Sequence, residues 1–135
     1  MQDVGTRRSF GALPDGREIE AVTIAAGDLS ADILSFGAVL RELRLDGADH
    51  TLVLGFNSLA DYLNHSRSHG ITAGRYANRI AEGRFELDGQ TWQLEKNFLD
   101  RHHLHGGSTG FGLRPWVIEA VADASVRLAL MSQDG

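Results

Sequence analysis

Two short motifs hold the residues whose types and spacing are best suited to chemistry. Residues 74–80 read GRYANRI, and residues 104–107, which begin 24 positions after Ile80, read LHGG. Arg79 lies in a strand-like segment of small and apolar residues. A guanidinium there must pair with a carboxylate or face a polar cleft, because an unpaired buried charge is very costly. The residues alone therefore leave two interpretations of Arg79 open, a structural ion pair and a ligand contact.

His105 is the second candidate for a ligand contact. It precedes Gly106 and Gly107, whose lack of β-carbons permits a sharp turn and lets a ligand approach the backbone. A histidine that is hydrogen-bonded at a turn is the alternative. With His102 and His103 it also suggests a zinc site, but such a site needs three or four converging ligands. No partner motif such as His-Glu-x-x-His accompanies these residues, so we expect no metal.

The composition narrows the class of protein. The 135 residues suffice for one domain with a sizeable core. A formal net charge of −5 repels phosphate groups, so we expect neither a nucleic-acid partner nor an anionic membrane. The chain has no cysteine, no signal-like segment and no apolar run of membrane-spanning length, and we expect a cytoplasmic protein. No glycine-rich phosphate loop of the P-loop or dinucleotide type is present, because Gly106-Gly107 with Gly110 follows no βα pattern.

The secondary-structure elements that must position the motifs are predicted to be almost all β-strands. Short, mostly alternating apolar runs separated by turn dipeptides predict an antiparallel β-sandwich. The expected strands are residues 19–25, 29–36, 39–45, 51–54, 84–87, 91–94, 115–121 and 126–131. Asp88 and Gly89 predict a hairpin turn, because glycine takes the positive φ that primed turns require. Residues 58–63 predict one helical turn capped by Ser58, on which Asp61 and His65 are spaced to pair.

The end of the chain has an unusual pattern. A strand over residues 126–131 would lead into Asp134-Gly135, a turn dipeptide with nothing after it. Such a strand would leave an edge of unpaired backbone groups, so we expect a chain cut within a hairpin. A frayed polar tail, or a homo-oligomer that completes the sheet across a subunit boundary, are the alternatives.

The two motifs, together with Gly110-Phe111 and the stretch 81–94, resemble the sugar-binding part of the aldose 1-epimerase family. The resemblance implies that residues 1–135 are the N-terminal portion of a single galactose mutarotase-like β-sandwich (supersandwich) domain. It implies an isomerase that interconverts the α and β anomers of a hexose such as glucose or galactose, without a cofactor. By the same resemblance Asn78, Arg79 and His105 hold sugar hydroxyls.

Other residues take secondary roles in this interpretation. Phe111 and Trp116 match aromatic positions of the family and are expected in the core or the pocket wall. We expect Arg75 to be structural and Asn97 to form a turn. Strand alternation would send Asn78 and Arg79 to opposite faces, so a bulge or twist is needed if both residues touch the ligand.

Anomer exchange requires a base for the anomeric hydroxyl proton and an acid for the ring oxygen. The resemblance implies a glutamate base and a second histidine acid, both beyond residue 135, and we assign neither role to Glu82, Glu86 or Glu95. Residues 68–73 and 98–103 depart from the family pattern, so the loop over the sugar is expected to differ in shape.

Two alternatives remain at this point. One is a non-catalytic carbohydrate-binding or structural β-sandwich module. The other is a phosphorylated hexose as substrate, for which Arg67 and Arg101 are weak candidates.

Overall fold

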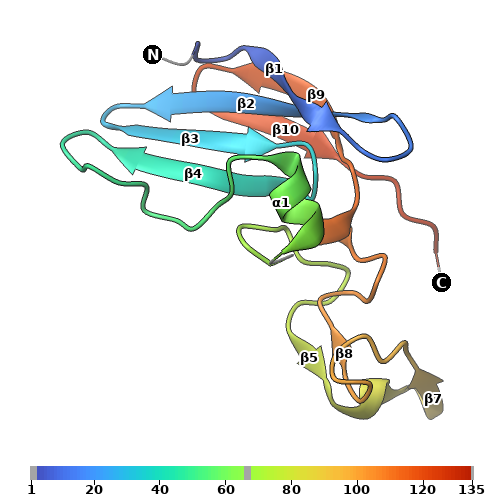
Figure 1. Cartoon of the computed structure of the whole chain (residues 1–135). Coiled ribbons are helices and arrows are strands. Elements are labelled where there is room, and N and C mark those ends of the chain that lie inside the picture. Colours follow the sequence, from blue (N-terminus) through green and yellow to red (C-terminus); the bar gives the residue numbers. More distant parts are fainter. Residues whose placement is uncertain (1–2, 66–67, 135) are drawn as a thin grey trace.

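The computed structural model describes residues 3–65 and 68–134. Its main layer is an antiparallel sheet in the order β1-β2-β3-β4 (Figure 1). The strands are β1 (Arg7–Ala12), β2 (Glu18–Ala26), β3 (Leu29–Leu34) and β4 (Val39–Leu45). The β2–β3 register pairs Ala21 with Leu34 and Thr23 with Asp32, so alternate residues of each strand reach the same face.

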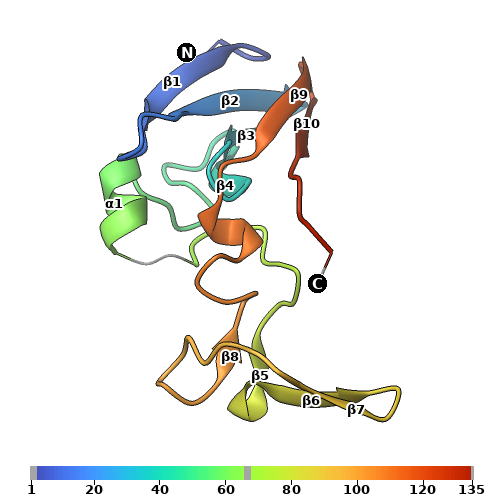
Figure 2. The ribbon, with the colours of Figure 1, turned by 90° about the vertical axis from the view of Figure 1, so that its right-hand side faces the viewer.

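A short helix and a hairpin cover opposite faces of this sheet (Figure 2). The helix α1 (Leu59–Asn64) begins where the Ser58 hydroxyl accepts a hydrogen bond from the Asp61 amide. Its Leu59 and Tyr62 join a buried core with the sheet. The remaining members of that core are Leu13, Ile19, Ala21, Leu34, Phe36 and Val39. The expected pair on the helix is also present, with His65 Nε2 3.4 Å from Asp61 Oδ1.

The second layer is the antiparallel pair β9 (Val117–Ala122) and β10 (Ser125–Ala129). Backbone hydrogen bonds join this pair to the main sheet at both ends. The Ala25 amide donates to the Asp123 carbonyl, and the Trp116 amide donates to the Ser35 carbonyl. Within the described residues, β10 pairs with no strand other than β9. The expected β-sandwich arrangement is thus confirmed.

The segments between these layers form a smaller region that projects away from the sandwich (Figure 1). It holds β5 (Arg79–Ile80), the 3₁₀ turn η1 (Ala81–Gly83), β6 (Arg84–Leu87), β7 (Gln90–Gln93) and β8 (His103–Leu104). The 3₁₀ turn η2 (Phe111–Leu113) lies back against the sandwich, where the Gly37 amide donates to the carbonyl of Arg114, the residue after η2. The predicted hairpin is present as β6–β7, and Asp88 and Gly89 have φ values of 52° and 75°. None of the described helices is long and apolar enough to cross a membrane.

The structure differs from the expected set of strands at two places. Residues 51–54 form no strand. The Leu52 amide donates to the Leu43 carbonyl, but the Leu43 amide donates to the Thr51 hydroxyl and not to a backbone carbonyl, so no regular ladder forms. Strand β1 was missed, since its start, Arg7-Arg8-Ser9, is polar. Arg7 and Arg8 make long-range contacts, to the Ile118 carbonyl at 2.7 Å and to Asp32 at 2.5 Å respectively.

Asp32 lies at the centre of a buried charge cluster in the main sheet. Its side chain is 2% exposed and accepts from Arg41 Nε and Arg8 Nη2, both at 2.5 Å. The Thr23 hydroxyl adds a third bond at 3.1 Å. A cavity of about 360 Å³ adjoins the cluster. Besides Asp32, the charged residues that line this cavity are Glu42 and Arg44, and they form an ion pair with each other. The cluster satisfies its own charges and therefore serves the fold.

We expect Asp32→Ala to lower the free energy of unfolding by about 3–5 kcal/mol, because it removes the buried carboxylate shared by Arg8 and Arg41 and leaves the buried Arg41 with Glu42 alone. Asp49→Ala, at an exposed position, is the matched control and should change stability by no more than about 0.5 kcal/mol. Urea unfolding followed by tryptophan fluorescence measures both variants. Equal stability of the two variants would show that the cluster adds nothing to the fold.

Candidate functional site

The structure places the two sequence motifs side by side in the projecting region. Strand β5 of the first motif pairs antiparallel with β8 of the second, with Arg79 opposite Leu104 and Ile80 opposite His103. Each strand is only two residues long, so the backbone ladder alone holds the motifs weakly. Other contacts must fix their relative position.

The closest of these contacts is between two glycines. A β-carbon built on Gly106 would lie 1.9 Å from the Gly74 carbonyl oxygen, far inside any permitted contact. The same carbonyl accepts a hydrogen bond from the Phe111 amide at 2.9 Å. On Gly74 itself a β-carbon would lie 2.3 Å from the Phe111 ring. The motifs therefore meet backbone to backbone, at positions where only glycine fits.

Asn78 and His105 exchange two hydrogen bonds beside this contact. The His105 amide donates to the Asn78 carbonyl, and the Asn78 amide donates to His105 Nδ1, both at 3.0 Å. Both residues have left-handed backbones, with φ of 63° at Asn78 and 50° at His105. Because Nδ1 accepts a hydrogen bond, the neutral imidazole carries its proton on Nε2 and offers a donor there.

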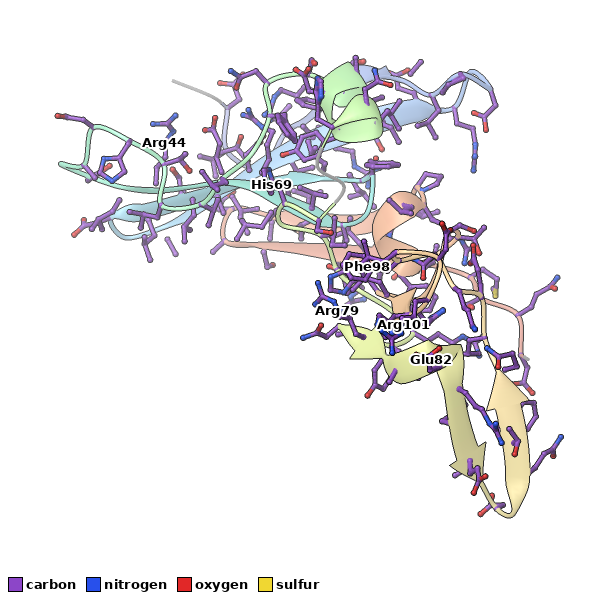
Figure 3. The ribbon with its side chains drawn as sticks, turned by 60° about the horizontal axis from the view of Figure 1, so that its bottom comes forward. Arg44, His69, Arg79, Glu82, Phe98 and Arg101 are labelled. Atoms are coloured by element: carbon purple, nitrogen blue, oxygen red, sulfur yellow. The ribbon has the colours of Figure 1, made fainter. Side chains whose placement is uncertain are left out.

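Arg79 lies at the surface and extends this network (Figure 3). Its Nη1 donates to Asn78 Oδ1 at 2.8 Å, and its guanidinium carbon lies 4.5 Å from the centroid of the Phe98 ring. No carboxylate of residues 3–65 and 68–134 forms an ion pair with it, so the interpretation as a structural ion pair was wrong. The left-handed backbone at Asn78 supplies the break in strand alternation that is required if both Asn78 and Arg79 touch a ligand.

Asn97 and Glu95 hold the second motif from the other side. The Asn97 side chain bonds both backbone groups of Leu104, at 2.8 and 2.9 Å, and so does more than form a turn. Glu95 Oε2 accepts from the Ser108 amide at 2.8 Å, and hydrogen bonding from Ser108 lowers the pKa of this carboxyl. A cavity of about 220 Å³ lies between Asn97, His105 and Ser108. Asn78 and Arg79 are outside its lining.

The three histidines near the second motif point to different partners. His102 Nδ1 accepts from the Glu82 amide at 3.1 Å, whereas His103 Nδ1 lies 2.9 Å from the Glu95 carbonyl. His105 is bonded to Asn78 as described. Among the residues that the structure describes, no three histidine, aspartate or glutamate side chains are grouped to hold a metal ion.

The other candidate residues are engaged within the protein. Arg101 Nε lies 2.6 Å from Glu82 Oε1, and this hydrogen bond is the main reason that the pKa of Glu82 is lowered. Arg67 lies outside the described residues. Arg75 donates to the Ser132 hydroxyl at 2.8 Å and to the Gln133 carbonyl, which confirms a structural role.

Phe111 and Trp116 form an edge-to-face pair at 6.2 Å, and Trp116 Nε1 donates to the Phe111 carbonyl. Both side chains are half-buried, as expected for a core or pocket wall. The contact of Phe98 with Arg79 was not predicted from the sequence, where residues 98–103 were interpreted only as a departure from the family pattern. An aromatic residue next to the anchoring Asn97 was the available signal.

The arrangement suits recognition of a polyhydroxylated ligand. Arg79 and His105 Nε2 present hydrogen-bond donors, and Asn78 presents a side-chain amide. A phosphate site would require further unpaired positive charges, and a metal site further unpaired negative charges.

The glycine contact yields a test with a matched control. Gly106 and Gly16 have φ of 87° and 88°, but a β-carbon on Gly16 would meet nothing within 4 Å. We expect Gly16→Ala to cost about 1 kcal/mol of stability through backbone conformation alone. Gly106→Ala should cost about 1–3 kcal/mol more because it also forces the motifs apart. Thermal and urea unfolding compare the variants, and equal losses would contradict the close approach.

Comparisons with known protein sequences identify the family of this chain. The family model described as aldose 1-epimerase matches residues 20–135. The galactose mutarotase of Mus musculus is 37% identical over 134 residues, which are 96% of this chain and 39% of the mouse protein. The galactose mutarotase of Rattus norvegicus is 36% identical with the same coverage.

Solved structures give the same result. The galactose 1-epimerase from Lactobacillus acidophilus NCFM superposes with a TM-score of 0.80 at 27% identity, over 96% of this chain and 39% of that one. The GalM/aldose epimerase homologue from C. elegans has a TM-score of 0.74 at 35% identity, over 82% of this chain and 35% of that one. The chain spans about two fifths of the length of the curated galactose mutarotases it matches. By family model, sequence and structure, this chain belongs to the aldose 1-epimerase family.

Proposed function

We propose that this chain binds a hexose such as galactose or glucose through Asn78, Arg79 and His105. One observation carries the proposal: the network from His105 through Asn78 to Arg79 ends in guanidinium donors that no described carboxylate neutralises. Sugar hydroxyls accept hydrogen bonds from charged donors without needing a negative charge. The galactose mutarotases and the galactose 1-epimerase similar to this chain carry a hexose in their names, which gives the ligand class.

We also propose that residues 1–135 are the N-terminal portion of a single epimerase domain and that a glutamate base and a histidine acid in further chain complete the reaction. Anomer exchange needs two proton-transfer groups with separated pKa values. Asparagine and arginine do not titrate near pH 7. The carboxyls of Glu82 and Glu95 have lowered pKa values, through Arg101 and Ser108 respectively, and this makes both of them poor bases.

The proposal predicts binding without catalysis. In a calorimetric or NMR titration, the 135-residue chain should bind galactose or glucose saturably. Arg79→Ala should weaken this binding about ten-fold or more, because a hydrogen bond from a charged donor contributes about 1.5–3 kcal/mol. The matched control is Arg84→Ala on the exposed hairpin, which should leave the affinity unchanged.

The same samples decide the catalytic half of the proposal. Polarimetry should show no mutarotation of α-glucose or α-galactose above the buffer rate. A clear acceleration that is lost in Arg79→Ala would contradict it. Absence of saturable binding, or equal losses in the Arg79 and Arg84 variants, would contradict the assignment of the sugar site.

A further inference from the structure

The guanidinium of Arg79 is held by an unusual set of contacts. Its strand β5 is two residues long and its side chain is exposed, so packing does not fix its rotamer. A free arginine side chain has a large rotamer entropy, and a ligand that orders the side chain has to overcome it on binding. Two contacts of Arg79 restrict it: the Asn78 amide oxygen and the face of the Phe98 ring.

The backbone of Phe98 is held by two hydrogen bonds. Its amide donates to the His102 carbonyl at 3.0 Å, and its carbonyl accepts from the His102 amide at 2.9 Å. Between them Leu99 and Asp100 both have left-handed backbones, with φ of 55° and 50°, which close a tight turn. Phe98 therefore lies at the base of a hydrogen-bonded turn.

The base of this turn is tied to the strand that faces Arg79. Asn97, the residue before Phe98, bonds both backbone groups of Leu104 through its side chain. Leu104 is the residue opposite Arg79 in the β5–β8 pair. Phe98 and Arg79 thus approach each other from two segments that share one anchor, and Figure 3 shows their side chains close together.

An aromatic ring and a carboxylate differ in how many N–H donors of a bound guanidinium they leave free for a ligand. A carboxylate would hold the guanidinium through its N–H groups and so compete with a ligand for the same donors. A ring attracts the cation through the negative charge density of its face and needs no N–H group. Of the five N–H donors of Arg79, one is therefore used by Asn78 and the rest remain available to hydroxyls.

We infer that Phe98 is a positioning residue for sugar binding, which orders the Arg79 guanidinium through its ring face while leaving the donors of Arg79 to the ligand. This inference rests on the proposed function for the affinity of the site, but the ordering of Arg79 can be observed without any sugar.

The test begins with the free protein. In ¹⁵N-labelled 135-residue chain, the Arg79 Nε–Hε proton should show a ring-current shift and its Nε should be ordered on the ps–ns timescale. Phe98→Leu, which keeps an apolar side chain and all the backbone bonds of the turn, should remove the shift and lower the order. Phe98→Tyr should retain both. Unchanged amide signals at Arg101 and His102 check that the turn itself persists.

The second readout is the affinity for galactose, measured by titration of the same samples. Phe98→Leu should weaken binding roughly two- to five-fold, the size expected for an exposed cation–π contact, and Phe98→Tyr should restore it. Phe85→Leu, which removes an aromatic ring from the β6–β7 hairpin, is the matched control and should alter neither readout.

Each outcome has a distinct meaning. An Arg79 signal that is identical in the wild type and Phe98→Leu would overturn the positioning role, whatever the sugar does. A lost Arg79 signal with undiminished galactose affinity would overturn its relevance to binding. If the wild type binds no hexose, the proposed function fails, and the Arg79 signal still decides whether Phe98 orders the guanidinium.

Discussion

The contact between Gly74 and Gly106 is the constraint on which the site depends. It lets two motifs that are far apart in sequence meet backbone to backbone, and a single β-carbon at Gly106 would fall 1.9 Å from the Gly74 carbonyl. The two-residue strands β5 and β8 then need to supply only the register, which sets Arg79 opposite Leu104. With this approach in place, the left-handed backbones of Asn78 and His105 bring their polar groups within hydrogen-bonding distance.

Arg41 and Arg79 lie in opposite environments. Arg41 is buried in the main sheet, where Asp32 neutralises it at 2.5 Å, and this charge pair belongs to the fold. Arg79 is exposed, and an amide oxygen and an aromatic ring hold it in place of a carboxylate. The first arrangement consumes the donors of the guanidinium, whereas the second orders the guanidinium and leaves most of its donors to a ligand. We propose that this difference separates the structural Arg41 from Arg79 as a sugar-binding residue.

The parts of the fold that were predictable from sequence are those set by local chemistry. Asp88-Gly89 specifies the β6–β7 turn, and Ser58 caps α1, because the backbone conformation at each point follows from the residues themselves. Strand β1 was not predictable, since the Arg8 side chain finds its partner, Asp32, across the sheet. The contact of Phe98 with Arg79 was missed for a similar reason. It requires left-handed backbones at Leu99 and Asp100, where no glycine signals them.

A crystal structure of the 135-residue chain soaked with galactose would test the central claim most directly. The account predicts one hexose whose hydroxyl oxygens lie within hydrogen-bonding distance of both the Arg79 guanidinium and His105 Nε2, with Phe98 still against Arg79. A hexose bound elsewhere on the protein, or one that touches neither Arg79 nor His105, would contradict it.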